Sequence, residues 1–132
     1  MKYFTLNELI RSTTARSRAI PNIPPPHVIE RLEALVDEVL DPIREAWGHP
    51  LRVNSGYRSE PLNRAVGGKP ASQHLTGDAA DITAGSRDAN RRLFEMIRGS
   101  RIPFDQLIDE SAYRWIHVSR STRPRRQALH LK

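Results

Sequence analysis

The chain has 132 residues, of which 21 are Lys or Arg, 15 are Asp or Glu and none is Cys. This length predicts one compact domain with a hydrophobic core of its own. The absence of cysteine excludes a disulfide scaffold, a Cys-ligated zinc finger and a cysteine nucleophile. No apolar run approaches the ~20 residues that a membrane-spanning helix needs, so we expect no membrane span.

The net charge of +6 is concentrated at the end of the sequence. Residues 120–132 contain five Lys or Arg and no acidic residue, which leaves the rest of the chain nearly neutral. We therefore expect a single domain over residues 1–121 and a flexible basic tail over 122–132. Such a tail is either a solvated terminus or a contact for a polyanion such as nucleic acid, lipid headgroups or an anionic cell wall.

The first half of the chain is predicted to be mainly helical. The capping-box sequence TLNE predicts a short helix over 6–11. Residues 12–26 are polar and then proline-rich, and we expect an extended loop there. From residue 27 to about 47, apolar side chains recur every three or four residues, which is typical of an amphipathic helix. Pro42 is expected to kink or break this helix.

The second half is predicted to contain short strands around one helix. A loop over a short helical turn is expected at 60–73, and Ser86 is expected to cap a helix that runs to about Arg98. The predicted strands are 51–54, 79–83, 104–108 and 115–119, the last two antiparallel. Helices followed by strands predict an α+β fold, a small antiparallel sheet with helices packed on it.

Two histidines and one aspartate are candidate metal ligands. His74 lies in the small-residue sequence SQHLTGDAADI, and Asp81 interrupts the apolar strand at the end of that sequence. A buried carboxylate without a partner is costly, and a metal ion would offset that cost. His117 lies in the middle of the strand WIHVS, on the face opposite Ile116 and Val118.

Two imidazoles and one carboxylate suit zinc, and three protein ligands leave a fourth position for water, as in catalytic sites. The same residues also fit a core histidine hydrogen-bonded to an aspartate, and the residues alone leave both interpretations open. The other three histidines, His27, His49 and His130, lie at predicted helix ends or in the basic tail, where capping or solvent contact explains them.

The sequence as a whole resembles a known family. The stretches SGYRS, SQHLTGDAADI, FDQLIDE and WIHVS are similar to those of the zinc D-Ala-D-Ala carboxypeptidase family, which includes D-Ala-D-Ala dipeptidases of vancomycin resistance and phage endolysin peptidases. The signalling domain of hedgehog proteins shares that fold. The family pattern, S-x-H-x-x-G-x-A-x-D and a distal histidine, is matched at Ser72, His74, Gly77, Ala79, Asp81 and His117. The resemblance extends over roughly residues 5–120.

The resemblance implies roles for individual residues. It makes His74, Asp81 and His117 the ligands of a zinc ion, and it makes Arg58 a substrate-positioning residue. Ser72 either binds substrate or orients the His74 loop.

The general base is less clear from the sequence. Many members of the family carry an acidic residue three positions before the distal histidine, but this chain has Arg114 there. Alignment of FDQLIDE with the hedgehog-type stretch instead favours Glu110 as the base. Asp109 is the alternative base, and its side chain is expected to point away from that of Glu110. Asp78 is the next candidate after these two.

The resemblance implies a zinc-dependent peptidase, a monomer, that hydrolyses peptide bonds in peptidoglycan stem peptides. Whether it is a carboxypeptidase, a dipeptidase or an endopeptidase stays open. One alternative is a non-catalytic zinc module with the same fold. Another is a nucleic-acid-binding domain, against which the near-neutral body of the chain argues. Because the first residues lack a secretory hydrophobic region, we expect the protein to be cytoplasmic until released, or phage-associated.

Overall fold

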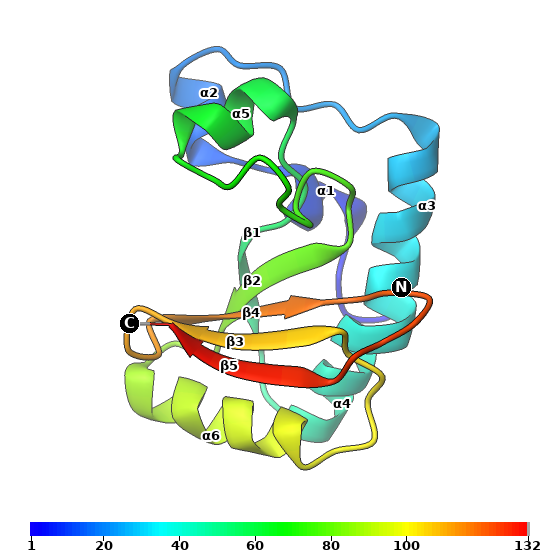
Figure 1. Ribbon diagram of the computed structural model, residues 1–132, viewed down its shortest axis with the longest axis vertical. Coiled ribbons are helices and arrows are strands. Elements are labelled where there is room, and N and C mark those ends of the chain that lie inside the picture. The colour runs from blue at the N-terminus through cyan, green and yellow to red at the C-terminus, as the bar shows by residue number, and fades with distance from the viewer. Residues whose placement is uncertain (132) are drawn as a thin grey trace.

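The computed structural model describes residues 1–131. Its helical elements are α1 Leu6–Ile10, α2 Thr13–Ser17, α3 Pro26–Leu35, the π-helical turn η1 Val36–Leu40, α4 Asp41–Trp47, α5 Glu60–Ala65 and α6 Arg87–Arg98. Its strands are β1 Arg52–Ser55, β2 Ala79–Thr83, β3 Gln106–Glu110, β4 Trp115–Ser119 and β5 Gln127–Leu131. The strands form one sheet in the order β1-β2-β4-β3-β5 (Figure 1), which confirms the predicted α+β class.

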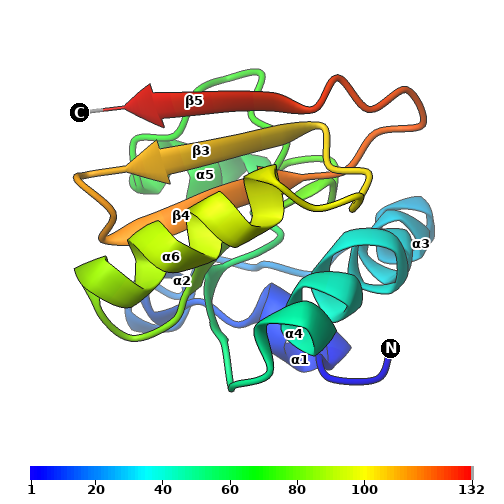
Figure 2. The same ribbon diagram turned by 90° about the horizontal axis from the view of Figure 1, so that it is seen from below.

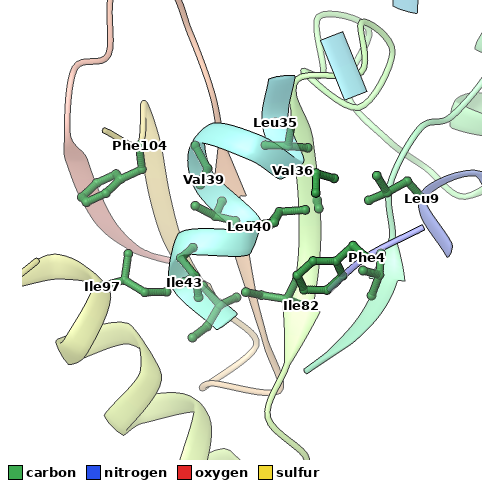
Figure 3. Close-up of a cluster of buried hydrophobic side chains, with 14 of the residues drawn as sticks. Phe4, Leu9, Leu35, Val36, Val39, Leu40, Ile43, Ile82, Ile97 and Phe104 are labelled. Atoms are coloured by element: carbon green, nitrogen blue, oxygen red, sulfur yellow. The ribbon is translucent and has the colours of Figure 1, made fainter. Parts of the chain in front are cut away.

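The two faces of the sheet have different surroundings. Helix α6 packs below β3 and β4, with α4 and α3 beside it (Figure 2). The apolar side chains of β2 and β4 that face these helices belong to the core, whereas the side chains that alternate with them point to the other face. Figure 3 shows this core, in which Leu40 and Ile43 lie near Ile82 of β2. The second face is thus left free for a functional site.

The N-terminal helices agree with their predicted caps. Thr5 and Glu8 form the capping box at α1, in which each side chain accepts the other's backbone N–H. The loop predicted over 12–26 is wrong in its first part, because α2 occupies Thr13–Ser17. Ser12 is its N-cap and accepts the N–H of Ala15. A capped five-residue helix lacks the apolar periodicity on which the sequence prediction depended.

The long helix changes its geometry at the predicted place. Five residues of π-helix, η1, separate α3 from α4, and Pro42 lies in the first turn of α4. Proline has no N–H to donate to the preceding turn, and a wider π-turn accommodates that loss. Gly48 ends α4 in the left-handed conformation, with φ of +79°.

The predicted strands are present, and β3 and β4 pair antiparallel as expected. Strand β3 covers Gln106–Glu110, two residues later than predicted, which places Glu110 at its end.

The expectation of a flexible tail over 122–132 is wrong for the described part, because Gln127–Leu131 form a fifth strand parallel to β3. Three basic side chains before β5 contact the rest of the fold. Arg120 pairs with Glu38, Arg125 pairs with Asp105, and Arg126 donates to backbone carbonyls near the C-terminal end of α6. A cation is favourable at that end of a helix. No helix in residues 1–131 is long and apolar enough to cross a membrane.

Candidate active site

The predicted metal-ligating residues lie together on the free face of the sheet. Asp81 Oδ1 is 3.3 Å from Nε2 of His74 and 3.1 Å from Nδ1 of His117. One candidate ligand atom from each residue lies within 4.8 Å of the other two, and all three residues are buried. Within residues 1–131 this is the one group of three or more His, Cys, Asp or Glu residues so arranged. The three could therefore hold a metal ion.

Two of these residues are placed by the sheet itself. Asp81 of β2 and His117 of β4 are partners in the antiparallel register. Directly opposed residues in such a pair project to the same face, with their Cβ atoms about 4.5–5.5 Å apart. Their neighbours Ala80, Ile82, Ile116 and Val118 point into the core, which locks the register. A one-residue slip of either strand would turn that strand's ligand away from the cluster.

His74 is placed by a loop and held through hydrogen bonds. Its Nδ1 donates to the backbone carbonyl of Gly56 at 2.7 Å, and its backbone N–H donates to Ser72 Oγ at 3.1 Å. With the proton on Nδ1, the lone pair of Nε2 faces Asp81. A hydrogen bond of this kind fixes the tautomer of metal-binding histidines. Gly56 has no room for a side chain, because a Cβ there would collide with the carbonyl of Leu9.

Asp81 is held in its ionised form. Burial alone would raise the pKa of Asp81, but His117 and His74, when they are protonated, donate hydrogen bonds and bring positive charge that hold this pKa well below the ordinary value for an aspartate. An ionised carboxylate between two imidazoles is a donor set that Zn²⁺ accepts. The chemistry of the residues present therefore fits a divalent metal.

The two candidate bases, Asp109 and Glu110, point in different directions. Glu110 lines the cleft above the cluster, and its Oε2 is 3.9 Å from Nδ1 of His117. Asp109 is buried away from the cluster, where it accepts the N–H of Tyr113 at 2.8 Å and Nδ1 of His130 at 2.9 Å. The predicted divergence of the two side chains is thus present. Asp78 contacts Thr76 and Arg31 and does not line the cleft.

The predicted substrate residues also border the cleft, which has a volume of about 650 Å³. Arg58 Nη1 donates to Asn63 Oδ1 at 3.2 Å. Burial lowers the pKa of Arg58, and the charges of Asp81 and Glu110 oppose that shift. Ser72 lines the cleft beside His74. The structure therefore brings the predicted ligands, the predicted base Glu110 and the predicted substrate residues together around one cleft.

Sequence reasoning missed two residues of the cleft. Among residues 1–131, three buried side-chain atoms lack a hydrogen-bond partner: Arg58 Nε, Gln73 Oε1 and Trp115 Nε1. All three residues line this cleft. Buried polar atoms are normally satisfied, so two donors and one acceptor here indicate a polar ligand or water. Strand alternation could have found Trp115, which shares a face with His117. Gln73, in a loop, carried no such signal.

An open cleft with two imidazoles and a carboxylate on its floor, and a further carboxylate on its wall, is the arrangement of a mononuclear metal-dependent hydrolase. The comparisons with known proteins agree with this class. The chain matches the peptidase M15 family over residues 2–119 and belongs to that family. The resemblance predicted from the sequence is therefore confirmed.

A curated relative points in the same direction. The zinc D-Ala-D-Ala carboxypeptidase of Streptomyces albus G is 47% identical to this chain over 49 residues. The aligned part makes up 36% of this chain and 19% of that protein. This chain thus matches about one fifth of the relative's length.

Proposed function

We propose that this chain is a zinc-dependent peptidase that hydrolyses peptide bonds in peptidoglycan stem peptides. The observation that carries the proposal is the buried cluster of His74, Asp81 and His117 at the floor of an open cleft. Membership of a peptidase family and similarity to a zinc carboxypeptidase support both the reaction and Zn²⁺ as the cofactor.

His74, Asp81 and His117 are the proposed zinc ligands. Nε2 of His74, Oδ1 of Asp81 and Nδ1 of His117 are the atoms that face one another. When bound, zinc supplies a Lewis acid that polarises the scissile carbonyl and activates a water molecule. The hydrogen bond from His74 Nδ1 to Gly56 keeps that imidazole in the tautomer that binds metal.

Glu110 is the proposed general base and acid. Its carboxylate is partly exposed to the cleft and lies close to His117 without being part of the ligand cluster. From this position Oε2 accepts a proton from the attacking water and delivers it to the leaving amine. Asp109 has no such access, because both of its carboxylate oxygens accept hydrogen bonds on the other side of β3.

Arg58 and Ser72 are the proposed substrate-binding residues. The Arg58 guanidinium keeps a buried Nε without a partner, which a carboxylate or carbonyl of the substrate would satisfy. The Ser72 oxygen already accepts the N–H of His74, so it orients the loop. Its hydroxyl hydrogen is left to donate to substrate.

The bond that is cut is the finer part of the proposal. A carboxypeptidase removes the terminal D-alanine, whereas an endolysin-type endopeptidase cuts inside the stem or cross-link. Mass spectrometry of products from purified peptidoglycan, with and without a chelator, tests the proposal. We expect new stem-peptide fragments that disappear on chelation. Stoichiometric zinc with no cleavage would favour the alternative, a non-catalytic zinc module with the same fold.

A further inference from the structure

A buried carboxylate outside the cluster connects the loop that carries His74 to the segment that precedes β5. Asp105 is 2% exposed and lies directly before β3. Its Oδ1 accepts the backbone N–H of Arg125 at 3.0 Å and Nε of Arg125 at 2.9 Å. Its Oδ2 accepts Nη2 of Arg125 at 2.8 Å and Nε2 of Gln73 at 3.0 Å. Four N–H donors thus converge on one carboxylate.

Gln73 is the link to the active site. It is the residue directly before His74, and its backbone carbonyl accepts the N–H of Asp78 and the hydroxyl of Thr76. The side chain of Gln73 is thus tied to Asp105, while its backbone organises the turn that follows His74. A shift of Gln73 would be passed on to the imidazole through a single peptide unit.

We propose that Asp105 and Arg125 are positioning residues of the active site: by holding Gln73 they fix the loop that places His74. Arg125 lies outside the part of the chain that matches the family, residues 2–119. The segment that the sequence predicted to be a flexible basic tail therefore supports the ligand geometry. This inference rests on the proposed function only in taking His74 as a metal ligand.

The same segment offers a matched control, the neighbouring residue Arg126. Arg126 anchors it on the opposite side, by donating to the backbone carbonyls of Arg98, Ser100 and Ile102 and by lying over the ring of Phe104. Arg126 makes none of the contacts to Asp105 or Gln73. Loss of Arg126 should loosen β5, whereas loss of Arg125 should also release the carboxylate that holds Gln73.

The test compares Arg125→Met, Arg126→Met and Gln73→Met in the full chain. Zinc affinity is measured by competition with a chromogenic chelator, and hydrogen exchange is measured over residues 72–78. We expect Arg125→Met and Gln73→Met each to weaken zinc binding by roughly 10-fold, the lower end of the effect of outer-shell partners, and to speed exchange in the loop. Arg126→Met should change neither. The double variant Arg125→Met, Gln73→Met should lose no more than either single variant, because both remove the same link.

Each outcome bears on the proposal. Gln73→Met leaves the Arg125–Asp105 pair in place, so it reports on the loop even where Arg125→Met fails to fold. Wild-type zinc affinity and exchange in both Gln73→Met and Arg125→Met would overturn the inference. So would an equal loss in Arg126→Met, which would show a general effect of destabilisation. If the wild-type protein binds no zinc, the proposed function fails, and the exchange data alone then decide the inference.

Discussion

Replacing Glu110 by Gln should separate catalysis from folding. The substitution preserves the size of the side chain but removes its basicity. Glu110 lies at the end of β3 with part of its side chain exposed, and within residues 1–131 its carboxylate makes no short hydrogen bond. We therefore expect the free energy of unfolding and the zinc content to be unchanged. Turnover should fall by roughly 10²–10⁴-fold, the usual contribution of a positioned acid–base group.

Asp109→Asn is the matched control, and the structure predicts that this variant loses stability but keeps its turnover. The buried Asp109 carboxylate accepts the N–H of Tyr113 and Nδ1 of His130. The Asn side chain has only one accepting oxygen, so an Asn that keeps the N–H of Tyr113 turns its amide group to the half-exposed His130, and losing that hydrogen bond to a charged carboxylate costs about 1–3 kcal/mol. Asp109→Asn should therefore be destabilised in urea denaturation, while its turnover per folded molecule stays close to that of the wild type.

The assay is hydrolysis of a peptidoglycan stem peptide by the zinc-loaded variants, with kcat and KM determined separately. A base that acts in the transition state changes kcat and leaves KM nearly constant. An inactive Asp109→Asn variant beside an active Glu110→Gln variant would refute the assignment of the base. If both variants stayed active, the base would lie elsewhere in the cleft.

Three further predictions concern stability. Arg125 and the other donors lower the pKa of Asp105 to about 2, below the ordinary value of about 3.9, so ionised Asp105 stabilises the fold above about pH 4. Urea titrations should show Asp105→Asn to be less stable by about 2 kcal/mol at pH 7, with the difference vanishing as the pH falls towards 2. Deleting residues 122–132 should lower the free energy of unfolding by about 2 kcal/mol or more in the same assay, because β5 is lost and Asp105 loses its main partner. Wild-type stability of the truncated chain would contradict the structural role of β5. Gly56→Ala should lower the free energy of unfolding by about 1–3 kcal/mol, because the added methyl group overpacks against Leu9. It should also weaken zinc binding, because the Gly56 carbonyl accepts the hydrogen bond from His74. An unchanged melting temperature and zinc affinity would contradict this role of Gly56.

The ligand cluster could be predicted because its signals are local. Asp81 breaks an apolar strand and His117 occupies the middle of another, so strand alternation alone assigns both side chains to one face. That β2 and β4 are neighbours is a property of the sheet order, which no local pattern contains. His74 lies in a loop, so strand alternation does not place its side chain. Its residue type makes it a candidate ligand, and the family pattern assigns it to the same site as the other two residues.

The C-terminal strand could not be predicted from composition. The sequence RSTRPRRQALHLK resembles a solvated basic terminus, because charge and proline are typical of such segments. Its order comes from distant partners: Asp105, the carbonyls at the end of α6, and the free edge of β3. These are tertiary contacts, and they hold the segment as a strand although its local sequence favours a strand only weakly.

The metal content of the purified protein tests the central claim most directly. The wild-type chain and the double variant His74→Ala, His117→Ala are dialysed in parallel against zinc-containing and then zinc-free buffer, and bound zinc is measured by mass spectrometry. Since two of the three proposed ligands are removed, we expect about one zinc per chain in the wild type and none retained by the variant. Stoichiometric zinc in the double variant would contradict the assignment of the site.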